Sequence, residues 1–381
     1  MKKIAIAGAG FSGCIIASEL AKIQKYKIDI FEKRSHIGGN CYSERDKQTN
    51  VMVHVYGPHI FNTSKKEIWD YISHLTPMKP YINRVKAVTA KGEFPLPVNL
   101  RTINLFFDKN FTPEEAKLFL TEQSDATIVE PKTFEEQALK FIGHDLYKNF
   151  FYGYTKKQWG VEPKELPASI LKRIPVRFTD DDNYYNSLYQ GIPEFGYTPI
   201  FEKLIAHDAI TVHYNSDFPQ NLKKYDYIFY TGPLDAYFDY EFGQLPYRSL
   251  MFEKNYANQT YQSNAVVNYC EEKIPYTRIS EHKHFAPWET HEKTVYFKEY
   301  SKQATKTDIP FYPIRMAQDK SALDQYVEKA QSLSNVTFVG RLATYRYLDM
   351  DQVIAEALQV SQKCLATPMD QWPRFPEPVA K

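Results

Sequence analysis

The chain has 381 residues, more than the roughly 250 to 300 at which a single hydrophobic core stops growing, so we expect two or three structural units. Its 47 basic and 46 acidic residues leave a formal charge of +1, which argues against nucleic acid or an anionic membrane surface as a partner. Four cysteines without CxxC spacing predict neither a disulfide framework nor a zinc site, and no apolar run approaches the ~20 residues of a membrane span.

The first stretch, MKKIAIAGAGFSGC, has two possible interpretations. It resembles an export signal that ends at a lipidated Cys14, and it also resembles a nucleotide-binding turn with the spacing GxGxxG. Glycines interrupt the apolar segment that an export signal needs, residues 15–21 continue as an amphipathic helix, and residues 27–31 read as a second buried strand ending at Glu32. This order of strand, glycine turn, helix, strand and acid favours a dinucleotide-binding fold.

Each position of this unit has a physical role. Gly8 permits the tight turn, Gly10 lets the backbone approach a pyrophosphate, and Gly13 lets the helix pack closely on the strand. The pyrophosphate would lie at the helix N-terminus, and Glu32 would accept hydrogen bonds from a ribose.

Two further segments favour FAD over NAD. The Gly38-Gly39 pair soon after Glu32 permits a second close approach of the backbone to the same cofactor. Near the end of the chain, a strand at 336–339 runs into Gly340-Arg341, and Asp349 then caps a helix. A late helix N-terminus suits the electron-rich end of a flavin, although an ordinary strand–helix unit would explain this last segment equally well.

The middle of the chain changes character. Residues 64–172 read as mainly helical, with a capping box at Ser64–Glu67 and further helices starting at Pro113 and Thr133. Residues 84–89 and 94–100 read as strand and edge segments, and the alternating runs 265–269 and 294–297 indicate an antiparallel sheet. The proline-dense segment 372–378 is expected to leave the fold as a loose end.

These patterns predict an α/β fold with a discontinuous Rossmann-like FAD-binding domain, a helical insertion domain and an antiparallel β-sheet domain. The predicted boundaries are 1–80, 197–235 and 330–365 for the FAD-binding domain, 98–172 for the helical domain, 81–97, 173–196 and 236–329 for the sheet domain, and 366–381 for the tail.

Three stretches in the middle carry chemistry. The aromatic residues of 150–160 suit the stacking of a base whose edges Thr155 and Gln158 read, although core packing is the simpler interpretation of that cluster alone. Arg173 and Arg278 are candidates to grip two phosphates, although a lone arginine is usually a solvated surface charge. His282 and His284 lack a third ligand at suitable spacing, so we expect no metal site.

In combination, GAGFSG, EKRSHIGGN, YGPHIF, GYTKKQWG, ELPASILKRIPVRF, DDNYY, YQGIP, YTGPLDAYFDY, PYTRISEHKHF, FYP and GRLATYRYLDMDQVI resemble the bacterial UDP-galactopyranose mutase family over about residues 3 to 365. The resemblance implies a cytoplasmic, homodimeric FAD enzyme that converts UDP-galactopyranose to UDP-galactofuranose for surface polysaccharide. It also implies that the flavin must be reduced, by NAD(P)H or another reductant, and that its N5 nitrogen attacks the anomeric carbon.

The resemblance assigns roles to individual residues. Arg173 and Arg278 match the arginines that bind the diphosphate, and Tyr184, Tyr312 and Tyr347 match tyrosines near the leaving bond. The expected catalytic residues are Arg173, Arg278, Tyr347, Asp349 and His59. The expected substrate-binding residues are Phe150, Phe151, Tyr154, Thr155, Trp159, Tyr184, Tyr312, Asn83 and Asn62. The expected cofactor-binding residues are Gly8, Gly10, Phe11, Ser12, Gly13, Glu32, Lys33, Gly39, Asn40, Tyr56, His59, Gly340, Arg341, Asp349 and Met350.

One position departs from the family pattern. Many galactose mutases read YGxHIFHT, whereas Asn62 stands here where a second histidine is usual. An imidazole and an amide differ in size, charge and donor pattern, so UDP-N-acetylgalactosamine and dTDP-fucopyranose remain alternative substrates. An amine-oxidase-like FAD oxidoreductase and a non-catalytic binder of nucleotide sugars are the alternatives from other classes.

Overall fold

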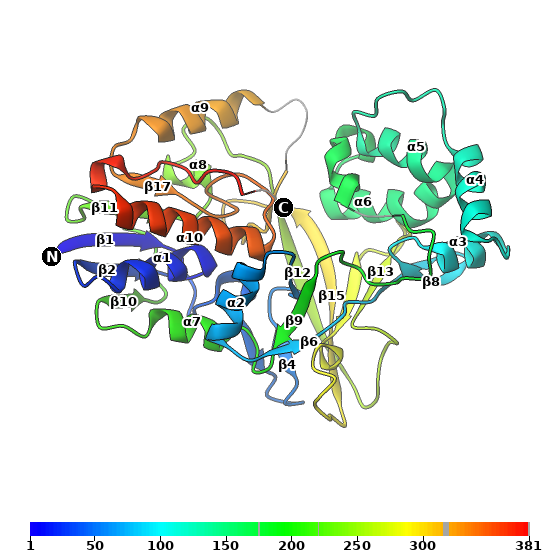
Figure 1. Cartoon of the computed structure of the whole chain (residues 1–381), viewed down its shortest axis with the longest axis horizontal. Coiled ribbons are helices and arrows are strands. Elements are labelled where there is room, and N and C mark those ends of the chain that lie inside the picture. The colour runs from blue at the N-terminus through cyan, green and yellow to red at the C-terminus, as the bar shows by residue number, and fades with distance from the viewer. Residues whose placement is uncertain (174–175, 220, 315–319, 380–381) are drawn as a thin grey trace.

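The computed structural model describes residues 1–173, 176–219, 221–314 and 320–379, with the backbone alone for Lys172, Arg173 and Lys320. Within these ranges the chain forms a five-stranded sheet, a seven-stranded sheet and a group of helices (Figure 1). The five-stranded sheet lies at one end of the molecule, most of the helices from the middle of the chain lie at the other, and the longest strands lie between them (Figure 1).

The five-stranded sheet is parallel throughout. Its strands, in spatial order, are β10 (Ile210–His213), β2 (Tyr26–Phe31), β1 (Lys2–Ala7), β11 (Tyr227–Tyr230) and β17 (Val336–Phe338). Successive side chains of a strand point to opposite faces, so Ile4 and Ile6 pack into one hydrophobic core and Ala5 and Ala7 into another. A parallel sheet of this kind must be covered on both faces.

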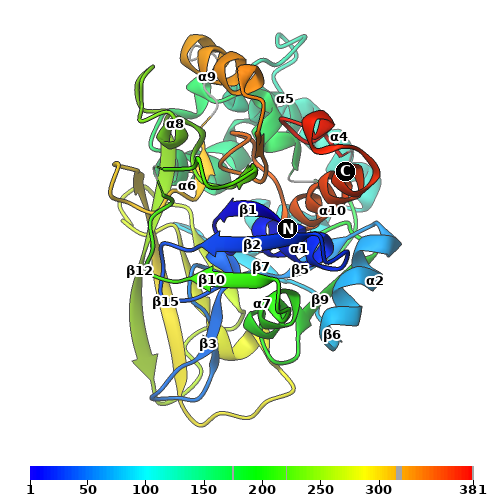
Figure 2. The ribbon, with the colours of Figure 1, turned by 90° about the vertical axis from the view of Figure 1, so that its left-hand side faces the viewer.

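Helices cover those two faces (Figure 2). The core on the Ile4 side includes residues of α1 (Phe11–Ala21), α2 (Lys66–Leu75), α7 (Thr198–Ile205) and α10 (Met350–Ala366). The core on the Ala5 side includes residues of α8 (Leu234–Tyr237) and α9 (Lys320–Ser332). Helix α9 crosses the boundary predicted at residue 330 and packs against this sheet through Tyr326 and Ala330. The remaining domain boundaries stay predictions.

The seven-stranded sheet is formed, in spatial order, by β16 (Tyr312–Pro313), β12 (Tyr247–Ala257), β15 (Thr294–Gln303), β14 (Arg278–Glu281), β13 (Val266–Tyr269), β7 (Val85–Thr89) and β8 (Gly92–Leu96). Its neighbouring strands are antiparallel, as predicted, except that β13 and β7 are parallel. Strand β8 lies at the edge of the sheet, where a proline such as Pro95 is tolerated.

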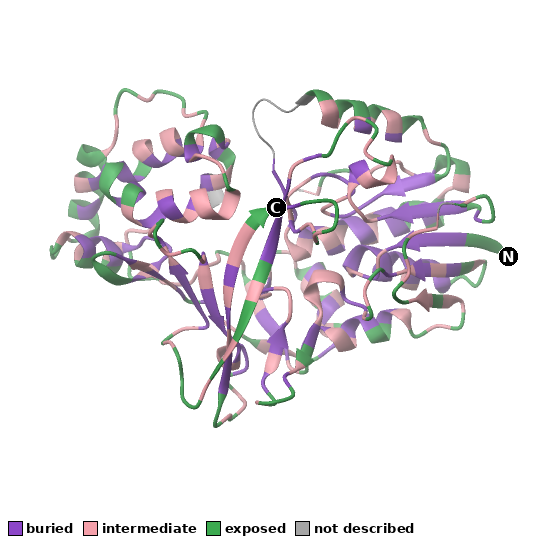
Figure 3. Cartoon of the chain, turned by 180° about the vertical axis from the view of Figure 1, so that it is seen from behind, coloured by how far each residue is buried: buried purple, intermediate pink, exposed green. Residues whose placement is uncertain are grey.

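Two smaller sheets connect the large ones. Strands β3 (Ser43–Arg45) and β4 (Met52–His54) form a hairpin, and β9 (Tyr189–Pro193) lies between β5 (Phe61–Thr63) and β6 (Met78–Pro80). The helical group contains α3 (Leu100–Phe107), α4 (Pro113–Gln123), α5 (Phe134–Leu146), a π-helical turn (Tyr147–Tyr152) and α6 (Gly153–Trp159). Figure 3 shows that these helices turn their buried residues inward and their exposed residues to solvent.

Local capping signals were predictive at two helices and misleading at a third. Thr112 and Thr133 each form a capping box, with Glu115 and Glu136, at the starts of α4 and α5. The capping box predicted at Ser64 is wrong, because α2 begins at Lys66 with Lys65 at its N-cap position. The Ser64 hydroxyl instead accepts a hydrogen bond from the backbone N–H of Leu188 at 3.4 Å, just before β9.

The prediction of a loose C-terminal tail is also wrong for the described residues up to 379. Trp372 is buried and packs edge-on against Tyr227 at 4.6 Å between ring centroids. The backbone N–H of Phe338 donates to Arg374 O at 2.8 Å, so the tail lies along the outer edge of β17. Proline density predicts irregular backbone, but it does not prevent aromatic side chains from packing. Within the described ranges, no helix is both long and apolar enough to cross a membrane.

Candidate active site

The glycine turn after β1 has the geometry of a dinucleotide cradle. Gly8 has a φ of +91°, which favours glycine, and α1 begins at Phe11 with Gly10 at its N-cap position. A Cβ at Gly13 would lie 2.1 Å from the carbonyl oxygen of Gly8, so the helix contacts the turn without room for a side chain. The first helical N–H groups are therefore open to an anion at this end of the sheet.

The second glycine segment lies against the first. A Cβ at Gly39 would lie 3.2 Å from the Cα of Gly10, and the backbone N–H of Gly38 donates to Ala9 O at 2.8 Å. Glu32, at the end of β2, is buried and accepts hydrogen bonds from the backbone N–H groups of Ala9 at 2.8 Å and Arg34 at 2.9 Å. Two segments about 30 positions apart in the sequence thus lie side by side, backbone against backbone.

Arg34 adds a positive charge beside these two segments. Its guanidinium lies 4.1 Å from the centroid of the Tyr56 ring, and Nη2 donates to Asn40 Oδ1 at 2.7 Å. Nη1 is buried and has no hydrogen-bond partner among the described residues. Such a group is costly to bury unless a ligand satisfies it, so the residues present fit an anionic dinucleotide such as FAD.

The late segment of the chain reaches the same place. Gly340 has a φ of +89°, and a Cβ there would lie 2.7 Å from the Oγ of Ser12. Asp349 is the N-cap residue of α10, and the thiol of Cys41 contacts the sulfur of Met350 at 3.6 Å. Residues 8–13, 32–41 and 340–350 therefore form one cluster.

The side chains of two predicted cofactor residues make contacts outside this cluster. The Lys33 ammonium is exposed and lies 3.7 Å from the carboxylate of Asp217. The Phe11 ring packs into the core against Phe201, at 4.6 Å between centroids, so only its backbone faces the cradle. Cys14, the lipid-anchor candidate, is fully buried, which raises the pKa of its thiol.

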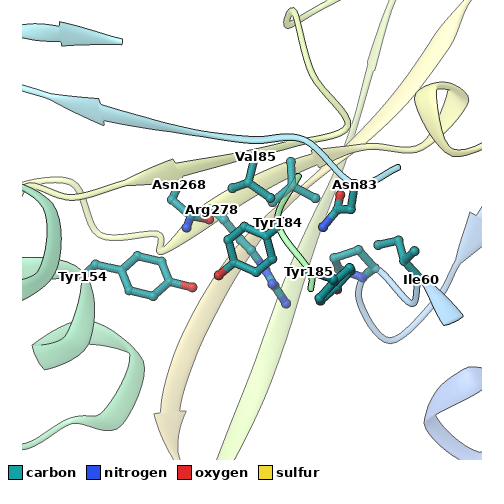
Figure 4. Close-up of a pocket in the computed structure, with 10 residues that line it drawn as sticks. Ile60, Asn83, Val85, Tyr154, Tyr184, Tyr185, Asn268 and Arg278 are labelled. Atoms are coloured by element: carbon teal, nitrogen blue, oxygen red, sulfur yellow. The ribbon is translucent and has the colours of Figure 1, made fainter. Parts of the chain in front are cut away.

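A polar pocket lies between the seven-stranded sheet and the helical group (Figure 4). It encloses about 60 Å³ and is lined by Pro58, Ile60, Asn83, Val85, Tyr154, Tyr184, Tyr185, Val266, Asn268 and Arg278. The amide oxygens of Asn83 and Asn268 are buried without a hydrogen-bond partner in the described part of the chain. Unsatisfied amides in a pocket indicate a polar ligand, and a nucleotide sugar would have to push the lining side chains apart.

Arg278 supplies the charge of this pocket. Its Nε donates to the buried carboxylate of Glu299 at 2.8 Å, while Figure 4 shows its side chain extending past Tyr184. Burial opposes the charge, but Glu299 raises the pKa of Arg278 above its usual value, so the guanidinium stays cationic. Because one nitrogen is used by Glu299, the other edge of the guanidinium is available to an anion.

A row of rings leads from this pocket toward the cradle. Trp159 lies 6.5 Å from Tyr312, and Tyr312 stacks on Tyr347 at 5.5 Å with 12° between the ring planes. The Arg341 guanidinium lies 5.0 Å from the Tyr347 ring and donates from Nε to Leu348 O at 3.0 Å. Burial raises the pKa of Tyr312, so its hydroxyl remains a donor.

Three histidines lie where the cradle meets the pocket. The Nδ1–H of His59 donates to Gly57 O at 2.7 Å, and its backbone N–H donates to Nδ1 of the buried His54 at 3.1 Å. The backbone N–H of His54 in turn donates to Nδ1 of His282 at 3.2 Å. Burial is the main cause that lowers the pKa of His59 to about 4, so this imidazole is neutral at physiological pH.

Asn62 lies on β5, two residues after the pocket residue Ile60. Its amide oxygen accepts a hydrogen bond from the hydroxyl of Ser187 at 2.9 Å, and its amide nitrogen donates to Ile60 O at 3.3 Å. The amide is therefore held in one orientation next to the pocket.

Not every predicted substrate residue reaches the pocket. Phe150 lies in the core between Phe94 and Phe106, at 5.4 and 5.2 Å between ring centroids, and Phe151 and Thr155 are buried as well. These three side chains are therefore buried, whereas Tyr154 of the same stretch lines the cavity. The side chain of Arg173, together with Ile174 and Pro175, lies outside the described residues.

Tyr185 and Asn268 also line the pocket, although no sequence pattern had singled them out. Tyr185 directly follows the expected Tyr184, and Asn268 interrupts the apolar run of β13, where an amide is unusual enough to have been noticed. His284 lies 3.2 Å from Glu281 instead of facing a metal, and the described residues contain no group of three or more candidate metal ligands.

Comparisons with known proteins agree with this geometry. Residues 149–347 match the family described as UDP-galactopyranose mutase, and residues 6–75 match an NAD(P)-binding Rossmann-like domain. A probable UDP-galactopyranose mutase from Klebsiella pneumoniae is 53% identical, with 99% of each chain covered. A dTDP-fucopyranose mutase from Escherichia coli is 49% identical, with 95% of this chain and 98% of the relative covered.

Among solved structures, a reduced UDP-galactopyranose mutase has a similar fold. The TM-score is 0.75 at 14% sequence identity, with 96% of this chain and 94% of that chain covered. At this identity the likeness concerns the fold alone.

Proposed function

The chain belongs to the UDP-galactopyranose mutase family, and we propose on this premise that it binds FAD and interconverts UDP-galactopyranose and UDP-galactofuranose. The observation that carries the proposal is the position of Arg278, a half-buried cation on the wall of a polar pocket from which a row of aromatic rings leads to the dinucleotide cradle. This arrangement suits an anionic diphosphate with a sugar directed at the cofactor.

The cofactor would lie along the backbone of the dinucleotide cradle. Its pyrophosphate would sit at the N-terminus of α1 beside Gly10 and Gly39, and its ribose near Glu32, with residues 340–350 toward the ring. When bound and reduced, FAD supplies a nucleophilic ring nitrogen for the anomeric carbon of the sugar. The role of the protein is to bind and orient the cofactor and the substrate and to hold charged groups near the reacting bond.

Arg278 would donate hydrogen bonds to the diphosphate, and Arg173 would do so from the other side. The hydroxyls of Tyr184, Tyr312 and Tyr347 would donate to phosphate oxygens near the bond that breaks. Because burial raises the pKa values of Tyr184 and Tyr312, these two hydroxyls keep their protons and stabilise the negative charge of the departing UDP.

The base and the sugar would occupy opposite ends of the site. Tyr154 would stack on the uracil, with Phe150, Phe151 and Thr155 packed behind it. Trp159, Asn83 and Asn62 would face the sugar. His59 is neutral, so it would contribute a polar contact near the cofactor without repelling Arg278 or Arg341.

A second substrate is supported by a specific observation. The relative that acts on dTDP-fucopyranose, according to its name, is almost as similar as the galactose relative, at 49% against 53% identity. Asn62 also departs from the usual galactose pattern. We therefore keep dTDP-fucopyranose, and after it UDP-N-acetylgalactosamine, as alternative substrates of the same reaction.

The proposal also covers the oligomeric state, the location and the reductant of the enzyme. We expect a homodimer in the cytoplasm, with NAD(P)H or another reductant for the flavin, that supplies a furanose sugar for surface polysaccharide. Gel filtration with light scattering tests the dimer, and bleaching of the flavin absorbance by NADPH tests the reductant.

A substrate panel tests the proposed function. Purified protein with reduced flavin is incubated separately with UDP-galactopyranose, UDP-N-acetylgalactosamine and dTDP-fucopyranose, and the products are separated by chromatography. We expect the fastest conversion with UDP-galactopyranose. Oxygen consumption with amines but no conversion of any nucleotide sugar would instead support an amine-oxidase-like enzyme, and binding without turnover would support a non-catalytic binder.

A further inference from the structure

Lys157 makes an unusual set of contacts on α6. Its ammonium lies within hydrogen-bond distance of four backbone carbonyl oxygens, those of Tyr269, Glu271, Ile274 and Tyr276, at 2.8, 2.9, 2.9 and 3.0 Å, so its N–H groups are shared among them. No carboxylate of the described chain forms an ion pair with it, and burial lowers the pKa of Lys157 to about 8. Four converging carbonyl dipoles would repel one another without a cation among them, so the ammonium is an integral part of this contact.

The four carbonyls belong to the last residue of β13 and to the connection between β13 and β14. These two strands carry Asn268 and Arg278, which line one wall of the pocket. Helix α6 carries Tyr154 on the opposite wall, three positions before Lys157, so the two side chains lie on neighbouring faces of the helix. The bond from Lys157 to the connection therefore joins the two walls one helical turn from the predicted base platform.

Helix α6 also packs closely against the same connection at Gly153. A Cβ at Gly153, the first residue of α6, would lie 2.3 Å from the carbonyl oxygen of Cys270. The helix and the connection thus touch backbone to backbone. At the other end of α6, the buried Arg248 donates from Nε to Gln158 O at 2.9 Å, and the Ser301 hydroxyl donates to the same oxygen at 2.6 Å.

We propose that Lys157 is a positioning residue for nucleotide binding, which sets the distance and rotation of α6 relative to the β13–β14 connection and so holds Tyr154 opposite Asn268 and Arg278. Lys157 does not line the pocket itself. Its effect should therefore appear mainly in the affinity for the nucleotide and less in the rate of the chemical step, which takes place nearer the cradle.

The chain offers a matched control at the adjacent position. The Lys156 ammonium lies on the surface between the carboxylates of Glu162 at 2.7 Å and Glu272 at 2.9 Å. Exposed ion pairs of this kind contribute little. Lys156→Met removes the same charge from the same helix without removing the contact to the four carbonyls.

The test compares Lys157→Met with Lys156→Met as flavin-loaded protein. Calorimetry measures the dissociation constant for UDP, and steady-state assays separate kcat from KM. We expect Lys157→Met to raise the dissociation constant and KM by about tenfold or more with a smaller change in kcat, and Lys156→Met to change each of them less than about twofold. Lys157→Gln, which keeps two N–H donors, should recover part of the affinity.

This inference rests on the proposed function only in taking UDP as the ligand. Failure of the unmodified protein to bind UDP would contradict the proposed function, whereas unchanged UDP affinity in Lys157→Met would overturn the role of Lys157 alone. If neither Lys157 variant yields flavin-loaded protein while Lys156→Met does, Lys157 supports the fold as a whole and the positioning role is likewise overturned.

Discussion

The cofactor cradle and the nucleotide pocket are built by different means. The cradle is made of backbone: glycines at positions 8, 13, 39 and 340 bring three chain segments together where an added Cβ would lie within 3.2 Å of a neighbouring atom. The pocket is made of side chains, among them Asn83, Tyr154, Asn268 and Arg278, which come from a loop, a helix and two strands. A cradle of backbone tolerates almost no substitution, whereas a pocket of side chains can change its ligand one residue at a time.

The largest effect is expected in the cradle, for Gly13→Ala. The added methyl group would lie 2.1 Å from the Gly8 carbonyl oxygen, a backbone atom that cannot move without opening the turn. We expect the free energy of unfolding to fall by well above the ~1 kcal/mol that a typical substitution costs. The purified variant should show no flavin absorbance and a lower melting temperature. Gly10→Ala is the control, because its methyl would lie 3.8 Å from the Gly39 Cα. The Gly10 variant should fold normally but bind flavin weakly, and normal flavin content in Gly13→Ala would contradict the role of backbone contact.

In the pocket, Arg278→Ala should leave the flavin bound but lower the catalytic efficiency. Loss of a charged hydrogen-bond partner costs ~2 to 5 kcal/mol, so we expect kcat/KM to fall by roughly 30- to 5,000-fold. The variant also leaves the buried Glu299 without its partner, so urea denaturation is measured in parallel. The double variant Arg278→Ala/Glu299→Gln should recover stability without activity. Unchanged kcat/KM in the single variant would refute the assignment.

The histidines between the two regions should make stability depend on acid pH. Burial lowers the pKa values of His59 and His282 to about 4 and about 3, against ~6.5 in the unfolded chain. The unfolded state therefore binds more protons below pH ~6.5, so stability is full above that pH and is lost as the pH falls toward 4 and below. Relative to neutral pH, each such histidine lowers the free energy of unfolding by on the order of 3 kcal/mol once the pH lies below its folded pKa.

Urea denaturation at a series of pH values measures this loss. His282→Gln should flatten the dependence below pH ~6.5, whereas His144→Gln, at an exposed position, should leave it unchanged. A free energy of unfolding that stays constant between pH ~6.5 and ~4.5 would mean that the histidines are not held neutral.

The smallest effect is expected for Asn62→His, which tests whether pocket side chains select the sugar. The substitution replaces the amide held by Ser187 and Ile60 with an imidazole. We expect the ratio of kcat/KM for UDP-galactopyranose and dTDP-fucopyranose to change by about tenfold, or ~1.4 kcal/mol, while flavin content stays normal. A ratio equal to that of the unmodified protein would remove Asn62 from the explanation of substrate choice.

The difference between the cradle and the pocket also explains which parts of the structure could be predicted from the sequence. The cradle follows from local rules, since the glycine spacing, the helix and Glu32 lie within one short unit. The capping boxes at Thr112 and Thr133 are also local and were predictive, whereas the Ser64 hydroxyl bonds the backbone of Leu188, more than a hundred residues away. Local patterns predict structure well only where no distant segment competes for the same groups.

The pocket depends on distant pairings that no local pattern contains. Val266 and Asn268 of β13 face the same cavity as Val85 of β7 because the two strands pair in parallel, and Asn83 lies two residues before β7. Phe150 looked like a ligand contact in sequence but packs between Phe94 and Phe106. The tail was misjudged for the same reason, since Trp372 finds its aromatic partners only on the assembled sheet.

The most direct test of the account is turnover of UDP-galactopyranose with the flavin in its two redox states. The purified protein is assayed once with oxidised flavin and once after reduction by dithionite under anaerobic conditions, with chromatographic detection of UDP-galactofuranose. The account predicts furanose product with reduced flavin and none with oxidised flavin. Equal turnover in both states, or none in either state with any nucleotide sugar of the panel, would contradict it.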